Sequence, residues 1–259
     1  MIVRDILTRT QTFNSLLAGY LVLFPLATFA EPTVDPSDPA FQQAVEHVVE
    51  QYLLSHPEII EHTLQAMGAK HQVENREHVR KLIATKQEDL LNDPDSPMSG
   101  SLSGDVTVVE FFDYRCGYCR RAAGAVTQLQ KDDPNVRIVY KDFPILGEAS
   151  LFAARAALAS RSQGKHVAFH EALLAAKNEL SPKSILVIAA RAGLDTKRLQ
   201  TDMQTPTIQA TIEHNWALAR ELGINGTPGF IIGTELIPGA LDLQDLKQFT
   251  TKVRLERRG

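Results

Sequence analysis

The strongest constraint on the fold lies between residues 106 and 143, where a buried strand pattern runs directly into a helix pattern. Val106–Phe112 (VTVVEFF) is apolar on both sides of an extended chain, as expected for a central parallel strand that is covered on both faces. Cys119–Gln130 is compatible with a helix, and VRIVYKDF from Val136 predicts a second strand. The order strand, helix, strand predicts an α/β domain.

A helical insertion is expected to interrupt this sheet from about residue 148 to residue 222, where glycines and capping residues mark the ends of four or five helices. The segments TPGFIIG and ELIPG then predict two short strands, and DLQDLKQFTTKV predicts a closing helix with Asp242 as its N-cap. We expect the folded domain to span residues 106–254. The preceding stretch 92–105 (NDPDSPMSGSLSGD) has the composition of a linker.

Residues 31–91 predict an α-helical N-terminal extension. Helix starts are indicated at Asp38-Pro39 and at the capping box Ser55-His-Pro-Glu58, and a third apolar run covers residues 79–91. The polar stretch between Lys70 and Lys81 is expected to be a solvated spacer. Helices this short gain most of their stability by packing an apolar face, either on the next domain or on another copy. We favour self-association through residues 38–91, which predicts a homo-oligomer.

The first thirty residues resemble a secretory signal. Arg4 and Arg9 precede an apolar run from Leu16 to Ala30, which ends in small residues. A membrane anchor is the alternative, but a span needs about 20 apolar residues and Pro25 interrupts this run. Export would place the chain where disulfides form and persist. The net charge of −4 disfavours nucleic acid as a partner.

The chain has only two cysteines, Cys116 and Cys119, and they lie three apart in Cys-Gly-Tyr-Cys. Half of a zinc site would need further soft ligands, which the sequence does not offer at suitable spacing, so we expect no metal at the pair. A purely structural disulfide would close too small a loop to constrain the unfolded chain much. A reactive dithiol is the favoured interpretation.

Cys116 is the expected nucleophile, because it falls where a strand ends and a helix begins, close to free backbone N–H groups and the positive end of the helix dipole. Arg115 and Arg120, with Arg121, add positive potential that would stabilise a thiolate, although such a run can also be a solvated face.

The residues between and after the nucleophile have their own expected roles. Gly117 would allow a tight turn between the sulfurs, and Tyr118 would offer an aromatic surface for substrate or simply pack. Cys119, one turn further along the helix, is expected to be more buried and to resolve the mixed disulfide.

Two further positions complete the candidate site. Glu110 lies in an otherwise apolar strand, so burial would raise the pKa of its carboxyl group, which could accept a proton from Cys119. The alternative is a glutamate at the strand end that reaches solvent. Thr227-Pro228 precedes a predicted strand, and by itself the dipeptide predicts an ordinary turn, because only about 5% of such bonds are cis.

Several motifs in the same order resemble the DsbA-type branch of the thioredoxin superfamily, whose members are exported thiol:disulfide oxidoreductases. They are VVEFFDYRCGYC, KDFPILGEAS leading into AARAALA, and GINGTPGFIIG. Within that branch, FQQAVEHVVEQYLLSHPEIIEHTL is similar to the helical extension of the ScsC-like (suppressor of copper sensitivity) subgroup. The resemblance covers residues 38–254, and it implies a thioredoxin fold with an inserted helical subdomain.

The resemblance also implies roles for single residues. It implies an exposed Cys116, a buried Cys119, Glu110 as the buried acid, and a cis Pro228 that faces the cysteine pair. The Thr227 backbone would then pair with a substrate peptide. The Gly-Tyr dipeptide and the threonine before the proline resemble the disulfide isomerases of the family, which implies a less oxidising pair than in the oxidases.

The expected function is therefore a periplasmic disulfide isomerase or reductase-coupled enzyme that acts on cysteine-containing exported proteins. Its expected partner is a DsbD-like or DsbB-like membrane redox protein, and the subgroup implies a trimer or dimer. A monomeric oxidase is one alternative. The other is a copper-binding protein or chaperone that would use the cysteines with His47, His56, His62, His71 and His78. No organic cofactor is expected.

Overall fold

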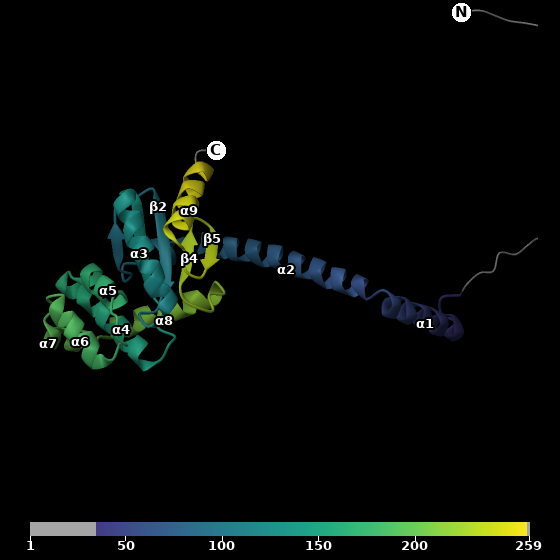
Figure 1. The fold of residues 1–259 in the computed structure, drawn as a ribbon, viewed down its shortest axis with the longest axis horizontal. Coiled ribbons are helices and arrows are strands. Elements are labelled where there is room, and N and C mark those ends of the chain that lie inside the picture. Colours follow the sequence, from purple (N-terminus) through teal and green to yellow (C-terminus); the bar gives the residue numbers. More distant parts are fainter. Residues whose placement is uncertain (1–34, 258–259) are drawn as a thin grey trace, which may run out of the picture. The chain divides into compact units, whose positions relative to one another are not determined.

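A computed structural model of the chain describes residues 35–257, so the expected signal segment 1–30 lies outside the described residues. The chain divides into two compact units, Met1–Thr63 and Leu64–Gly259. Figure 1 shows the helices and strands with the labels that are used below.

Helix α1 (Pro39–Ser55) forms the described part of the first unit together with the start of α2 (Pro57–Thr85). The Asp38 side chain caps α1 by accepting a hydrogen bond from the Ala40 N–H at 2.9 Å, and Pro39 occupies the first turn. Helix α1 has no buried residue. The polar stretch between Lys70 and Lys81, expected to be a spacer, is instead an inner part of α2, because its residues have good helix propensity and no proline breaks the run.

The second unit is built on a five-stranded sheet in the order β1-β3-β2-β4-β5. Strands β2 and β3 are parallel, and the other neighbouring pairs are antiparallel. The strands are β1 (Met98–Gly100), β2 (Val106–Phe112), β3 (Val136–Asp142), β4 (Gly229–Ile232) and β5 (Glu235–Pro238). Strand β2 lies in the centre, as its apolar pattern predicted.

Helices cover both faces of this sheet. On one face, α3 (Gly117–Asp132) and α9 (Leu243–Glu256) pack with the insertion over the side chains of Val108 and Phe112. On the other face, Ile83 of α2 and Leu222 after α8 pack against Phe111 and its neighbours. Asp242 forms a capping box at the start of α9, as predicted.

The insertion between β3 and β4 consists of helices, as expected (Figure 1). Its elements are α4 (Glu148–Ala159), η2 (Ser160–Gln163), α5 (His166–Leu174), α6 (Pro182–Arg191), α7 (Thr196–Asp202) and α8 (Pro206–Glu221). The α/β fold with an inserted helical subdomain is therefore confirmed.

The stretch 92–105 differs from the expected linker, because it contributes β1 at the edge of the sheet. The π-helical turn η1 (Glu88–Asn92) precedes it and buries Leu90. Lys141, whose side chain is fully buried, donates to the Asp93 carboxylate at 2.7 Å and to the Asp89 carbonyl at 2.6 Å. Burial lowers the pKa of Lys141, and the Asp93 carboxylate opposes that shift. This ion pair fastens the segment to β3.

Candidate active site

Cys116 is the N-cap residue of α3, at the point where the chain leaves β2. Its backbone N–H donates to the Asp113 carbonyl at 3.0 Å, and its Sγ donates to the Thr227 carbonyl at 3.1 Å. Only 6% of Cys116 is exposed, less than the resemblance implied, because the loop that carries Thr227 lies against the sulfur. Cys116 is nevertheless the more accessible cysteine, since Cys119 is fully buried.

Both cysteines are free thiols. Burial raises the pKa of Cys119 far above its ordinary value, and the nearby Glu110 carboxyl group and Cys116 sulfur add to that rise. A hydrogen bond with the Asp113 backbone opposes it. Cys119 therefore holds its proton at neutral pH and needs a base before it can attack.

Glu110 faces the α3 side of β2 and is 1% exposed. Its Oε1 has no hydrogen-bond partner among the described residues, and burial raises the pKa of the carboxyl group to about 8. Glu110 thus does not reach solvent at a strand end. A carboxyl group with this pKa, acting electrostatically on Cys119, has the properties of a base for that thiol.

The Thr227–Pro228 peptide bond is cis, as the resemblance implied, and Thr227 is half-buried. The loop leads directly into β4, so its position against Cys116 follows from the pairing of β4 with β2. Two segments that are 111 residues apart in the sequence thereby meet at one sulfur.

The arginines expected to stabilise a thiolate have other partners. Arg115 donates to the Leu146 carbonyl at 2.9 Å and to the Glu179 carboxylate at 2.5 Å, while Arg120 donates to the Tyr114 carbonyl at 3.3 Å. The Arg121 guanidinium lies 4.1 Å from the centre of the Tyr118 ring. Within residues 35–257, none of these guanidinium groups hydrogen-bonds to a cysteine sulfur.

Tyr118 and Gly117 lie at the mouth of the site. Tyr118 is 59% exposed, so its ring is available to a bound polypeptide. Gly117 begins α3 without a positive φ, and a Cβ at this position would meet nothing within 4 Å. The expected tight turn between the sulfurs is therefore absent at Gly117, because the backbone there is already helical. This conformation does not require a glycine.

Asp113 is a residue that the sequence reasoning missed. Its carboxylate accepts hydrogen bonds from the N–H groups of Arg115 at 2.7 Å, Ile145 at 2.9 Å and Leu146 at 3.0 Å, and from the Ser150 hydroxyl at 2.8 Å. Asp113 thereby holds the cysteine loop to the start of the insertion. The only sequence signal was an aspartate that follows a buried-strand pattern, three residues before Cys116.

A buried cluster of histidine and tyrosine side chains was also missed. Tyr114 and His170 share a hydrogen bond of 3.0 Å between the hydroxyl group and Nδ1, and the Tyr140 ring lies 4.3 Å from the His170 ring. Burial lowers the pKa of His170 to about 3, so this ring is neutral at physiological pH. A cavity of about 460 Å³ connects the cluster with Glu110. Only the spacing of His166 and His170, four apart in the insertion, could have indicated it.

No group of three or more His, Cys, Asp or Glu side chains in the described part of the chain is arranged to hold a metal ion. The five histidines of the extension, considered above as copper ligands, form no such group.

Residues 107–250 match the DSBA-like thioredoxin domain family. The match covers more than half of the chain, and the chain belongs to this family. The thioredoxin fold that the resemblance implied is therefore the fold of the family to which this chain belongs.

Solved structures give the same result. The chain is 50% identical to a thioredoxin-like oxidoreductase from Silicibacter pomeroyi DSS-3, covering 64% of this chain and 96% of that one with a TM-score of 0.64. It is 29% identical to ScsC from Proteus mirabilis in a transitional conformation, covering 84% and 98% of the two chains, with a TM-score of 0.64. The ScsC match is long enough to include N-terminal helices, so the expected likeness to ScsC is confirmed.

Curated relatives include the thiol:disulfide interchange protein DsbA of Bordetella pertussis, which is 25% identical over 53% of this chain and 68% of its own length. The Na(+)/H(+) antiporter NhaA 1 of Salinispora arenicola is 32% identical over 162 residues. That match covers 61% of this chain, and the chain spans only about a quarter of the antiporter. Among the described residues, no helix has the length and apolar character of a membrane span.

Proposed function

We propose that the protein is a thiol:disulfide oxidoreductase that acts on disulfides of other polypeptides through Cys116 and Cys119. The observation that carries this proposal is the position of Cys116, at the N-cap of α3 with its Sγ 3.1 Å from the Thr227 carbonyl. An open helix N-terminus favours a thiolate, and the adjacent loop offers backbone groups to an extended substrate.

The reaction follows from the burial of the two sulfurs. The Cys116 thiolate attacks a substrate disulfide, which forms a mixed disulfide and releases the other substrate sulfur as a thiolate. Cys119 then gives its proton to Glu110 and attacks the Cys116 sulfur. This second exchange releases the remaining substrate sulfur and leaves a Cys116–Cys119 disulfide, so two electrons pass from the protein to the substrate. If another substrate thiolate attacks first, the substrate disulfide is rearranged without net oxidation.

We infer that rearrangement or reduction, rather than oxidation, is the dominant direction. Strong oxidants of this kind stabilise the reduced form of the pair, in which the nucleophilic sulfur is a thiolate. Here Arg115 is paired with Glu179, and Arg120 donates to a backbone carbonyl. Gly117 and Tyr118 bring no charge between the cysteines. A membrane redox partner of the DsbD-like or DsbB-like kind would then maintain the pair.

The proposal includes export to the periplasm and self-association. Export rests on the expected signal in residues 1–30 and on the Salmonella enterica structural neighbour, a periplasmic thioredoxin-like protein that is 33% identical to this chain. Self-association rests on α1, whose apolar side chains lie exposed along one helix; they are Phe41, Val45, Val48, Val49 and Tyr52. Their spacing of three and four forms one apolar stripe.

Trapping in the native compartment tests the function. In Cys119→Ala the mixed disulfide at Cys116 cannot be resolved, so exported proteins with cysteines should accumulate as adducts that thiol reagents release. Cys116→Ala is the matched control and should form none. A folded Cys119→Ala protein that captures no polypeptide would contradict the proposed activity.

A second measurement tests the direction. The purified protein should restore activity to a substrate whose disulfides have been scrambled, with a reduction potential nearer that of isomerases than the roughly −120 mV of a strong oxidant. A protein that oxidises reduced substrate rapidly and leaves scrambled substrate unchanged would instead be an oxidase.

A further inference from the structure

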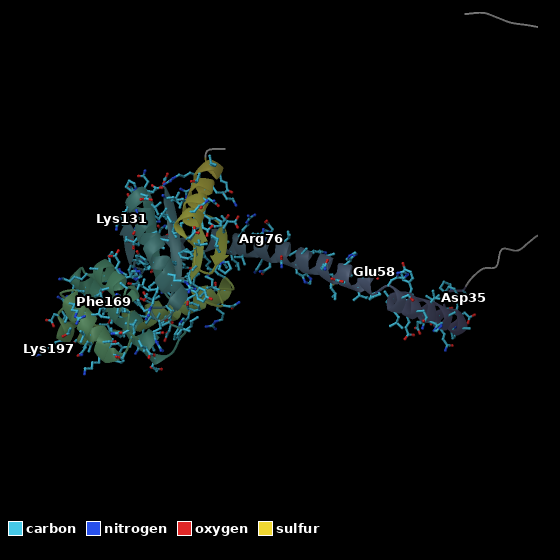
Figure 2. The ribbon with its side chains drawn as sticks, viewed as in Figure 1. Asp35, Glu58, Arg76, Lys131, Phe169 and Lys197 are labelled. Carbon is cyan, nitrogen blue, oxygen red and sulfur yellow. The ribbon has the colours of Figure 1, made fainter. Side chains whose placement is uncertain are left out.

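A cleft of about 520 Å³ lies between α2 and the loop that carries Thr227 and Pro228. Its α2 wall consists of Gln72, Asn75, Arg76, Val79 and Arg80. Residues 223–229 and the β4–β5 hairpin form the opposite wall. Figure 2 labels Arg76, which lies on α2 about one turn before Arg80, the residue that pairs with Glu235 of β5. The extension is therefore part of the surface around the candidate site.

The α2 wall presents hydrogen-bond donors that the fold does not use. Gln72, Asn75 and Arg76 are exposed and have no hydrogen-bond or ion-pair partner among residues 35–257. Arg80, by contrast, already donates to Glu77 and Glu235. An unused donor in a cleft is available to a ligand that carries acceptors.

The charge of the cleft favours an acidic ligand. Arg80 and Lys252 both pair with Glu235, so that carboxylate is already compensated. Arg76, by contrast, has no ion-pair partner within residues 35–257, so its charge is available to a ligand. A guanidinium group binds carboxylates through two parallel N–H donors, which selects Asp or Glu over neutral side chains.

The cleft shares the wall residue Thr227 with the candidate site. Thr227 belongs to its wall, and the Thr227 carbonyl is the group that contacts the Cys116 Sγ. A polypeptide joined to Cys116 in a mixed disulfide must pass this loop. An extended chain advances about 3.3 Å per residue, so three residues beyond its cysteine span roughly 10 Å.

We propose that this cleft binds the substrate segment that flanks the reacting cysteine, and that Arg76 selects an acidic side chain about three residues from that cysteine. The inference rests on the proposed function and names the class of polypeptide that the site prefers. Arg76 is a specificity-determining residue in this arrangement, because its side chain meets the substrate away from the sulfur atoms that react.

The test uses the reduced full-length protein and short peptides joined as disulfide dimers. The peptides carry Glu, Gln or Lys three residues before or three residues after their single cysteine. The second-order rate constant for disulfide reduction is measured for each. On one side of the cysteine, Glu should react about threefold to fivefold faster than Gln, the gain typical of a partly exposed ion pair, and Lys should react more slowly.

Arg76→Gln should abolish the preference for Glu over Gln, and Arg76→Glu should transfer the preference to Lys. Arg191→Gln removes the same charge from α6, which lines a different cavity, and should keep the preference. Equal rates for Glu and Gln peptides in the wild type, or a preference that survives in Arg76→Gln, would overturn the inference while leaving the proposed function intact. If the folded protein reduces none of the peptides, the proposed function fails as well.

Discussion

Glu110 is the residue at which burial and chemistry conflict most directly. A carboxyl group in the middle of a sheet loses its hydration, and no described partner of Oε1 compensates for that loss. The cost is avoided while the group is protonated, and it is incurred whenever Glu110 acts as a base. A pKa of about 8 leaves a minority of the protein ionised at neutral pH, which is the form that could deprotonate Cys119.

Glu110→Gln should change how the stability of the reduced protein depends on pH. The folded-state pKa of Glu110 is about 8 and its ordinary value is 4.5, so between these pH values the unfolded chain releases a proton that the folded protein keeps. The contribution of Glu110 to stability is therefore fully present below pH 4.5 and is lost as pH rises toward 8. Relative to the wild type, the variant should gain up to about 4 kcal/mol across this range.

Urea denaturation at a series of pH values measures this difference directly. Glu171→Gln, which changes an exposed carboxylate on the wall of the cavity that contains Glu110, is the control and should follow the wild type. A difference between Glu110→Gln and wild type that does not change between pH 4.5 and 8 would contradict the assigned burial of the charge.

At the scale of elements, a buried ion pair links the segment from η1 to β1 to the sheet, in addition to the pairing of β1 with β3. Removing one partner of such a pair leaves the other charge buried without compensation, which costs more than the pair itself contributes. The Lys141 side chain is 0% exposed and that of Asp93 only 12%. Asp93 is therefore needed to compensate the buried charge of Lys141.

Asp93→Asn should lower the free energy of unfolding by about 3 kcal/mol, and adding Lys141→Met should restore most of it, because no unpaired charge then remains. Asp132→Asn removes a partner of the exposed Lys247 and should cost less than 1 kcal/mol. Chemical denaturation of the four proteins measures these differences. A double variant that is no more stable than Asp93→Asn would show that the penalty is not the unpaired lysine.

At the scale of the whole molecule, we expect copies of the chain to associate through the exposed apolar stripe on α1.

Val48→Glu places a charge in that stripe and should convert the oligomer to monomers in sedimentation equilibrium. Val48 is 65% exposed in the single chain, so the substitution should leave the fold intact. Reduction of small peptide disulfides should persist, while reactivation of scrambled substrate should fall severalfold. Val187→Glu, at an exposed valine of α6, is the matched control. A wild-type protein that is monomeric would contradict this prediction.

Much of the fold could be predicted because its signals are local. The apolar run of β2 indicated a central strand, capping residues marked the insertion and α9, and both cysteines fell at a strand–helix junction. The extension was harder to predict. The polar face of α2 resembled a spacer because exposed helical turns and solvated coil have similar composition, and the short strand β1 was hidden in a stretch rich in Pro, Gly and Ser.

The sequence by itself determined most of the strands and helices, and that a cysteine begins α3, because these features depend on periodicity and on neighbours a few residues away. Only the tertiary structure decided the partners: Arg115 with Glu179, Lys141 with Asp93, and Cys116 with the Thr227 carbonyl. These contacts join residues 48 to 111 positions apart. The packing of the elements determines which side chains form ion pairs and hydrogen bonds with one another. The local sequence pattern does not determine this, because the same pattern is compatible with several pairings.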